Sequence, residues 1–470
     1  MRDLFVITVI TSLLPACFRR PYVGLLVFSW LAYMRVQDLS WGTVRNMRWS
    51  FYVAVLTFVG FMMNPKRTRF FIPDLRCFIM IFLVILVCLG VWNSEPGLPA
   101  TDKAQFGRMV EFAKIIGIAL FTTAVVTSKE HLRVLVWVIA LSFAFYGVKS
   151  GIWGIMTFGR IPIKTGPGGM LADNNDFSLA LVMSIPMLFH LGLTEKNETL
   201  RKVFHWSIPL TIITIALTHS RGGMLSLIGA CGVLIWRSKN RVAGFTAAGL
   251  LGLTVLLVGP SNLRSRLSTL KDVKTDSSAS ARFRSWAAAY RMATSNPALG
   301  VGLNKFRQSY MDYQPNPTAQ ELRGRDIYVA HNSYLQIWAE TGTISLFLYL
   351  YLIFRTFRTC WKLRKLAKKR YYSSWIINYA TMFEASLAGF CIGSTFLNRA
   401  HFDLVYHFFA IVLVFEKFAM EDLKVGAPVE LPVESGNRRR GELRRIRTPG
   451  FGARKPIHGF RDAPLLGDGR

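Results

Sequence analysis

The chain has 470 residues with 57 Lys and Arg against 27 Asp and Glu, a formal net charge of +30, yet 51% of it is hydrophobic and its mean hydropathy is +0.31. A water-soluble globule this apolar would expose large hydrophobic patches, and a disordered basic protein would contain far fewer Phe, Trp and Leu residues. The composition therefore excludes most soluble classes and indicates a polytopic membrane protein whose charge lies in loops and tails.

Apolar stretches that are long enough, or nearly long enough, to cross a membrane recur along the chain. About 20 apolar residues at ~1.5 Å each span the hydrocarbon core of ~30 Å. The stretches are 4–17, 21–35, 48–64, 76–92, 106–127, 131–158, 177–193, 204–219, 222–236, 242–259, 333–354, 375–397 and 401–419. They predict an all-α fold, a polytopic transmembrane bundle of about 12 helices with one long, partly helical periplasmic loop.

The first two stretches leave the number of crossings open. Arg19, Arg20 and Pro21 separate the short stretch 4–17 from the next one. If 4–35 makes one bent or partly re-entrant crossing, both chain ends lie inside; if both stretches span, there is one more crossing and the N-terminus lies outside. We favour the first arrangement. A secretion signal ending at Cys17 is less favoured, because many apolar segments follow.

Charge and hydropathy divide the chain into four parts. These are transmembrane helices 1 to about 9 or 10 in 1–259, a long basic periplasmic loop in 260–332, the C-terminal transmembrane helices in 333–420, and a disordered basic cytoplasmic tail in 421–470. Short basic stretches predict the cytoplasmic side, because Lys and Arg are enriched in cytoplasmic loops. They are 66–69, 129–133, 237–241 and 355–370.

The long loop carries positive charge on the side where topology does not require it. Between 260 and 330 there are eleven basic residues against five acidic ones, a net +6. Loops longer than about 60 residues escape the positive-inside rule, so this charge needs another reason. Within the loop, 279–294 predicts a helix with Ser277 or Ser278 as its cap, which could lie on the membrane face with its aromatic side chains inward.

Polar side chains near membrane depth are candidates for a functional site, because they are expensive to bury. Arg221 follows Ser220 in "HSRGG" between two apolar stretches, where it would meet an anion or a carboxylate, or extend to lipid headgroups. His331 opens "HNSYLQIWAETG" after the basic loop. At ~100° per residue Glu340 points away from it and lies ~13 Å deeper. His331 can therefore face the outer boundary and transfer a proton. On spacing alone, a histidine that caps the helix or lies at the membrane interface is the simpler interpretation.

Other polar residues have structural alternatives. Asn332 also fits a helix cap, and Glu340 fits a packing partner in the bundle. Asp173 and Asp176, in "LADNND", fit metal binding or, more simply, a cap of the next helix. The six cysteines are scattered through apolar stretches without a C-x-x-C pair, which predicts core residues. The sequence lacks GxGxxG, Walker, HExxH and GxSxG motifs.

Together these strings resemble a known family. A long loop with "SARFRSW" and "NPALGVGLNKF", then "HNSYLQIWAETG" opening a helix, and an earlier "SRGG" resemble the O-antigen ligase and polymerase superfamily. The string "GPGGMLADNNDFSLALVMSIP" is similar to the branch of O-glycosylation ligases associated with exosortase and exopolysaccharide systems. The resemblance covers roughly residues 1–420.

The resemblance implies a metal-independent, inverting glycosyltransferase, a glycan ligase without a cofactor. It would move an undecaprenyl-diphosphate-linked glycan to a lipid or protein acceptor, with no nucleic acid involved, at the periplasmic face of the bacterial inner membrane. By the same resemblance, His331 would be catalytic, and the residues that bind the diphosphate would be Arg221, Arg282 and Arg284. Possible supporting residues are Asn332, Glu340, Arg291 and Asp173. The chain departs from the family at Leu303 and Asn304, where family loops usually carry Gly-Pro.

Two alternatives stay open. A polymerase of the same superfamily would join repeat units to one another. A non-enzymatic transporter of lipid-linked glycans would be expected to line a path through the membrane with polar residues and to contain repeats. The polar candidates of this chain cluster at one side and its sequence shows no repeat, which favours an enzyme.

Overall fold

The fold is helical, as the sequence predicts. The computed structural model describes residues 2–40, 43–64, 69–94, 99–238, 240–246, 249, 277–325, 327–369 and 373–425. Within these ranges the regular elements are helices, and extended pairing is limited to a single bridge between Thr165 and Asp173. The all-α fold class is therefore confirmed.

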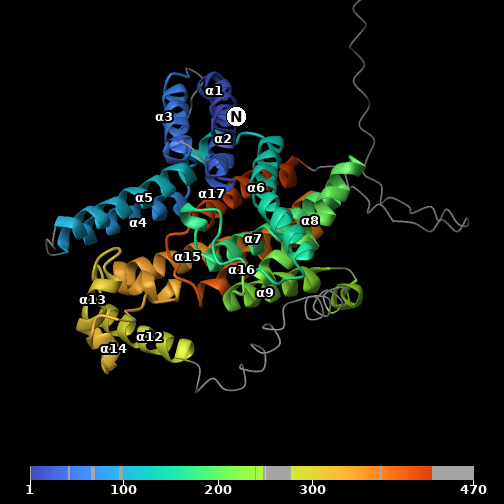
Figure 1. Ribbon diagram of the computed structural model, residues 1–470. Helices are drawn as coiled ribbons and strands as arrows, with labels where there is room; N and C mark the ends of the chain where they lie inside the picture. The colour runs from blue at the N-terminus through green and yellow to red at the C-terminus, as the bar shows by residue number, and fades with distance from the viewer. Residues whose placement is uncertain are drawn as a thin grey trace, which may run out of the picture. The chain divides into compact units, whose positions relative to one another are not determined.

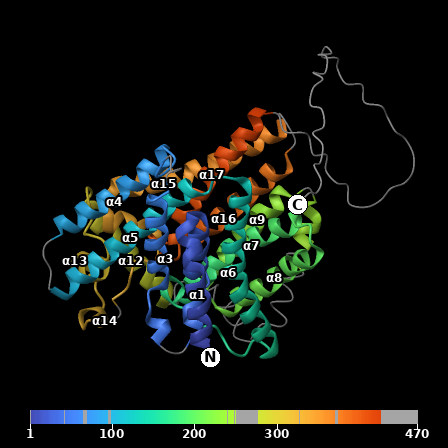
Figure 2. The ribbon, with the colours of Figure 1, turned by 90° about the horizontal axis from the view of Figure 1, so that it is seen from above.

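The helices follow the apolar stretches of the sequence. They are α1 (Arg2–Arg19), α2 (Pro21–Tyr33), η1 (Val36–Leu39), η2 (Thr43–Asn46), α3 (Trp49–Met62), α4 (Leu75–Asn93), α5 (Pro99–Val125), α6 (Lys129–Met156), η3 (Gly169–Leu171), α7 (Asn174–Thr194), α8 (Glu198–Leu217), α9 (Arg221–Arg237), α12 (Ser277–Ser295), α13 (Phe306–Tyr313), α14 (Ala319–Leu322), α15 (Ser333–Lys369), α16 (Ser374–Ser394) and α17 (Asp403–Val425). Figure 1 shows α1, α2 and α3 side by side and α12, α13 and α14 grouped together; Figure 2 gives the view from above.

Six helices of the described residues are long and apolar enough to cross a membrane, judged by length and composition: α4, α6, α7, α8, α15 and α16. The apolar helices α2 and α3 are shorter. Most of the predicted stretch 242–259 lies outside the described residues. The expected number of about 12 crossings stays a prediction.

The first two helices form a hairpin. Arg20 separates them in an extended conformation, and Val6 near the start of α1 belongs to the same buried cluster as Val36 just after α2. Both helices pack on α3, where a side chain at Gly24 would overlap Thr57 and one at Gly60 would overlap the backbone of Phe18. The region 4–35 therefore contains two helices that fold back on each other; whether they make one re-entrant crossing or two crossings stays a prediction.

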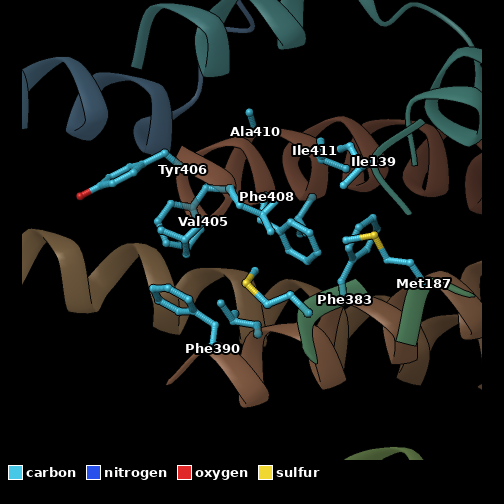
Figure 3. Packing of buried hydrophobic residues seen from close by; sticks show 14 of the residues in the cluster. Ile139, Met187, Phe383, Phe390, Val405, Tyr406, Phe408, Ala410 and Ile411 are labelled. Atoms are coloured by element: carbon cyan, nitrogen blue, oxygen red, sulfur yellow. The ribbon is translucent and has the colours of Figure 1, made fainter. Parts of the chain in front are cut away.

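The buried core lies where α7, α16 and α17 meet. The apolar window of α7 is 83% buried inside the protein, and its Met187 lies beside Phe383 of α16. Figure 3 shows these side chains with Phe390 and Phe408, which are fully buried. Because protein surrounds α7 on most sides, residues at its first turn are held in a fixed position relative to α16 and α17.

The basic stretches of the sequence gather at one end of the bundle, where ion pairs join the helices. The pairs are Lys129–Asp422 (2.6 Å), Arg133–Glu195 (3.1 Å), Arg237–Glu384 (2.6 Å) and Arg364–Glu384. They connect the start of α6 and the middle of α16 with the ends of α7, α9, α15 and α17. Three of the four predicted basic stretches thus share one end, and most of the fourth, 66–69, lies outside the described residues.

The basic stretch 355–370 follows the predicted apolar stretch 333–354, and the structure shows that it is helical up to Lys369. Helix α15 continues from Ser333 to Lys369. The reason is a second amphipathic face: Thr356, Cys360, Leu363 and Ala367 are buried at helical spacing, while Leu, Lys and Arg are good helix formers. Likewise α17 reaches Val425, so the tail predicted from 421 begins later; residues after 425 lie outside the described part.

The predicted helix 279–294 of the long loop is confirmed as α12. It packs on α15 through small residues, with Ala288, Ala289 and Met292 buried against Phe306 of α13. The aromatic side chains Phe283 and Tyr290 are exposed by 60% and 57%. Their contact with a membrane surface stays a prediction.

A kink in α15 at Gly342 receives the loop that follows α12. Gly342 has φ 88° and ψ 175°, which interrupts the helical hydrogen bonds of its neighbours. Three backbone hydrogen bonds replace them: Val301 N to Ala339 O (2.8 Å), Gly302 N to Glu340 O (3.1 Å) and Thr343 N to Pro297 O (2.8 Å). Gly300, with φ 67°, is equally close to α15, because an added Cβ would lie 2.5 Å from Ala339 O. The loop and the kink therefore form one packed unit.

We expect Gly342→Ala to lower the stability of the protein by about 2 kcal/mol or more, because the new Cβ adds strain at positive φ and overlaps Ala298 O. Thermal unfolding in detergent measures the change. Gly324→Ala is the matched control, since Gly324 has φ 70° and open space around an added Cβ. Equal losses in the two variants would contradict the packing of the loop against the kink.

Candidate functional site

The N-termini of α7 and α9 lie together. Asn174 in the first turn of α7 donates a hydrogen bond from Nδ2 to Thr218 O at the end of α8 (2.8 Å). Ser220 caps α9 by accepting from Gly223 N (3.0 Å). A Cβ at Gly223 would overlap Ser178 Oγ of α7, so the Gly-Gly pair allows the two helices to approach closely.

The N-terminus of α15 joins the same region through the segment between α16 and α17. Ser333 Oγ donates to Leu397 O (2.8 Å) and accepts from Arg399 N (2.8 Å). Leu397 in turn lies against Gly222 of α9, where an added Cβ would be 3.4 Å away. Three capped helix N-termini therefore meet at one end of the bundle, and their backbone dipoles favour negative charge there.

An ion pair between Arg399 and Asp176 connects this segment to α7. The Asp176 side chain is buried, and in the structure it forms this ion pair. The sequence had also allowed it a role in metal binding. Burial lowers the pKa of Arg399 to about 10, while the charges of Asp173 and Asp403 act in the opposite direction. The guanidinium stays charged at neutral pH. Sequence reasoning did not select Arg399; its only signal was a polar "NRAHFD" between two apolar stretches.

His331 lies at the junction between the long loop and α15. It has a positive φ of 46° and is half-buried. The preceding residue is held by Trp286 of α12, whose Nε1 donates to Ala330 O (3.0 Å), and the following Asn332 caps α15. Burial, and next the charge of Arg282, lower the pKa of His331, whereas the charge of Asp173 acts to raise it. The imidazole is therefore neutral at neutral pH.

The two candidate arginines of α12 have different surroundings. Arg282 is close enough to His331 for its charge to lower the pKa of the imidazole. Arg284 pairs with the buried Glu321 of α14 (Nε to Oε1, 3.2 Å). Glu321 also accepts from Tyr310 (2.8 Å), so this carboxylate holds α12, α13 and α14 together. The position of Arg282 thus suits the binding of a ligand at the site. Arg284, in contrast, stabilises the fold of the loop through its ion pair with Glu321.

Two further sequence candidates, Asp173 and Glu340, have different surroundings. Asp173 caps α7 by accepting from Asn175 N (2.9 Å), and its charge acts on both His331 and Arg399. Glu340 is buried and accepts from Phe306 N (3.4 Å) and Gln336 Nε2 (3.2 Å), so it supports the loop at the kink.

Two arginines are exposed. Arg291 lies in the second half of α12. Arg221 is the first residue of α9, at the meeting point of the helix N-termini. Its guanidinium can reach an anion placed there without losing its own hydration beforehand. Of the sequence candidates, the fold brings five to one region: His331, Asn332, Arg221, Arg282 and Asp173.

The arrangement combines a neutral imidazole with arginines from separate elements. Guanidinium groups bind phosphate oxygens through paired hydrogen bonds, and a neutral imidazole can accept a proton. Among the described residues, groups of three or more His, Cys, Asp or Glu side chains that could hold a metal ion are absent. The residues present are suited to binding an anionic group and to removing a proton beside it.

Two family models match parts of the chain. Residues 206–350 match the family described as O-antigen ligase, and residues 1–196 match a family of unknown function (DUF5935). The curated proteins contain no match. His331, Arg221 and Arg282 lie in the first segment, and Asp173 lies in the second.

We expect the pKa of His331 to lie below the ordinary histidine value of about 6.5. Arg282→Gln should raise it, because a cation that disfavours the imidazolium is removed, and Asp173→Asn should lower it further. Histidine-selective NMR over a pH series measures both shifts. Arg291→Gln, an exposed charge on the same helix, is the matched control. An unchanged pKa in Arg282→Gln would contradict the proximity of these two residues.

Proposed function

We propose that this chain, which belongs to the O-antigen ligase superfamily by its residues 206–350, is a membrane glycan ligase. It is a multi-pass membrane protein, since that family match accompanies six helices able to cross a membrane. The donor in this proposal is a glycan linked to undecaprenyl diphosphate. The acceptor is a lipid or protein hydroxyl at the periplasmic face of the inner membrane. The exosortase-associated branch is part of the proposal and rests on the string at 166–186.

The observation that carries the proposal is the position of His331 between Arg282 and the joined N-termini of α7, α9 and α15. A neutral imidazole can take the proton of the acceptor hydroxyl. The hydroxyl oxygen then forms a bond to the anomeric carbon while the bond from that carbon to the diphosphate breaks. Attack from the side opposite the diphosphate inverts the configuration. The proton ends on His331 and the diphosphate leaves with its electron pair.

Arginines stabilise the leaving group in this proposal. Negative charge grows on the diphosphate as its bond to the sugar breaks, and guanidinium groups that are already in place stabilise that charge. Arg282 and Arg221 supply it from α12 and α9, and Arg399 adds a third cation that the Asp176 carboxylate holds in position. Arg284 contributes by holding the loop, through Glu321. The bilayer restricts the donor to one plane, so the enzyme need only orient the acceptor and the phosphates.

Replacing His331 with Ala should lower glycan transfer by roughly 10²- to 10⁴-fold, the usual contribution of a general base. Transfer is measured with purified protein and an undecaprenyl-diphosphate-linked glycan. His205→Ala is the matched control, because His205 is exposed on α8. Thermal unfolding of both variants should match that of the parent chain. Full activity of His331→Ala would exclude the proposed base.

Loss of the gene product in cells should leave long glycan chains that are not attached to an acceptor. A ligase acts after the chain is complete, so its absence leaves polymer length unchanged. Gel analysis of lipid-linked and acceptor-linked glycans distinguishes this result from its alternative. Accumulation of single repeat units would instead identify the polymerase of the same superfamily.

A further inference from the structure

A groove in the N-terminal half of the chain, outside the segment that matches the O-antigen ligase family, has no role in the mechanism above. Its volume is about 1050 Å³, and it lies between the facing sides of α3 and α5. Helix α3 packs on α1 and α2, whereas α5 packs on α4 and α17, so the two walls belong to different helix groups. The walls are mainly apolar and rich in phenylalanine: Phe28, Phe51, Phe58, Phe61, Phe70, Phe71, Phe106 and Phe121.

The groove has a cationic end and an aromatic end. Lys114 of α5 lies over the ring of Phe51 at the start of α3, 5.1 Å from its centroid. At the other end Phe61 of α3 contacts Phe121 of α5, with 5.2 Å between ring centroids. The two helices therefore run in the same direction along the groove. The cations that line the first end are Arg35, Arg45, Arg48 and Lys114.

Carboxylates also lie near this end, and Arg35 and Arg45 of the mouth contact one of them. Of those that line the groove, Glu111 pairs with Arg108 (2.9 Å), and Asp403 lies in the field of Arg399 and Arg35. Asp38, beside the groove, pairs with Arg35 and lies 3.9 Å from Arg45. Arg48 and Lys114 are exposed. The mouth therefore keeps an excess of positive charge, which suits an anionic headgroup.

The length of the groove fits one leaflet of a bilayer. Ten residues separate Phe51 from Phe61, which at ~1.5 Å per residue corresponds to about 15 Å. The hydrocarbon core is ~30 Å thick, so the groove covers roughly half of it. An apolar chain whose headgroup lies at the cationic mouth would extend along this length toward the aromatic end.

The mouth lies next to the candidate functional site. A side chain at Gly169 would overlap the guanidinium of Arg35, and one at Gly168 would lie 2.9 Å from Asp38 Oδ2. Four residues after Gly169 the same segment reaches Asp173, whose charge acts on His331. A lipid in the groove would therefore present its headgroup on the side of the bundle where His331 lies. This position distinguishes a substrate lipid from a lipid that only fills the surface.

We propose that the groove between α3 and α5 binds the polyprenyl chain of the glycan donor, with its phosphates entering at the mouth formed by Arg35, Arg45, Arg48 and Lys114. The inference rests on the proposed function and deepens it, because it assigns donor-lipid binding to the half of the chain whose family has no known role. The apolar walls suit a chain of isoprene units, and the cations suit a diphosphate.

Gly117 provides the test. It lies on the groove wall of α5, and an added Cβ there has nothing within 4 Å, so Gly117→Leu fills the groove without displacing backbone. Leu also favours the helix over Gly. Gly232→Leu is the matched control: Gly232 lies in α9 with equally open space and does not line the groove. Thermal unfolding of the full-length variants should match the parent chain.

Two measurements are made on each variant. The first is KM for a donor with an undecaprenyl chain and for a short-chain donor, the same glycan diphosphate with a methyl group in place of the polyprenyl chain. Gly117→Leu should raise KM for the long-chain donor about tenfold and leave the short-chain KM unchanged. The second is retention of undecaprenyl diphosphate by the purified chain in native mass spectrometry, with phosphatidylglycerol as competitor. Gly117→Leu should lose the polyprenyl lipid, and Gly232→Leu should keep it.

The two proposals can fail separately. If the parent chain transfers glycan and Gly117→Leu leaves KM for both donors unchanged, the groove assignment is wrong and the ligase function stands. If Gly117→Leu releases phosphatidylglycerol but keeps undecaprenyl diphosphate, the groove binds bilayer lipid and the assignment is again wrong. If the parent chain transfers nothing, the ligase function fails, while the mass-spectrometric result still decides what the groove binds.

Discussion

The kink of α15 at Gly342 is the constraint on which the site depends. A broken helix leaves backbone groups that must find partners, and here Val301, Gly302 and Pro297 supply them. Because those residues follow α12 directly, the same hydrogen bonds fix α12 against α15, and Trp286 adds a second attachment at Ala330. Main-chain hydrogen bonds at a distance from both residues thus help to set the separation between Arg282 and His331.

The two ends of the bundle use their charges differently. At the basic end, Arg237 and Arg364 share Glu384, and Lys129 meets Asp422, so cations are matched by carboxylates and join helices. At the opposite end, Arg399 pairs with Asp176, Arg221 begins α9, and the backbone dipoles of three helix N-termini add to the positive field. The charge at the basic end therefore has a structural role, and we propose an anionic ligand for the other end.

Sequence patterns predicted what depends on local spacing. Helix 279–294 and the polar position of His331 follow from neighbouring residues, and the structure has α12 at that place. The sequence could not decide between Arg282 and Arg284, because residues two positions apart on a helix have different surroundings. The partner of Arg284, Glu321, lies 37 residues further along the chain. The Arg399–Asp176 pair was equally invisible, since it joins segments more than 200 residues apart. The helix through 355–369 was not predicted, because its many basic residues made the apolar pattern of its buried face hard to recognise.

The length of α15 beyond its kink measures membrane depth. Trp361 is 54% exposed, with Lys365 over its ring at 5.3 Å, and such a pair suits the interface between lipid and water. Nineteen residues separate it from Gly342, which corresponds to about 28 Å of helix, close to the ~30 Å hydrocarbon core. If Trp361 marks one interface, Gly342 would lie near the other, and His331 would lie beyond it, toward the headgroups. In the proposed reaction, a hydroxyl presented from water and a diphosphate anchored in lipid would meet at that depth.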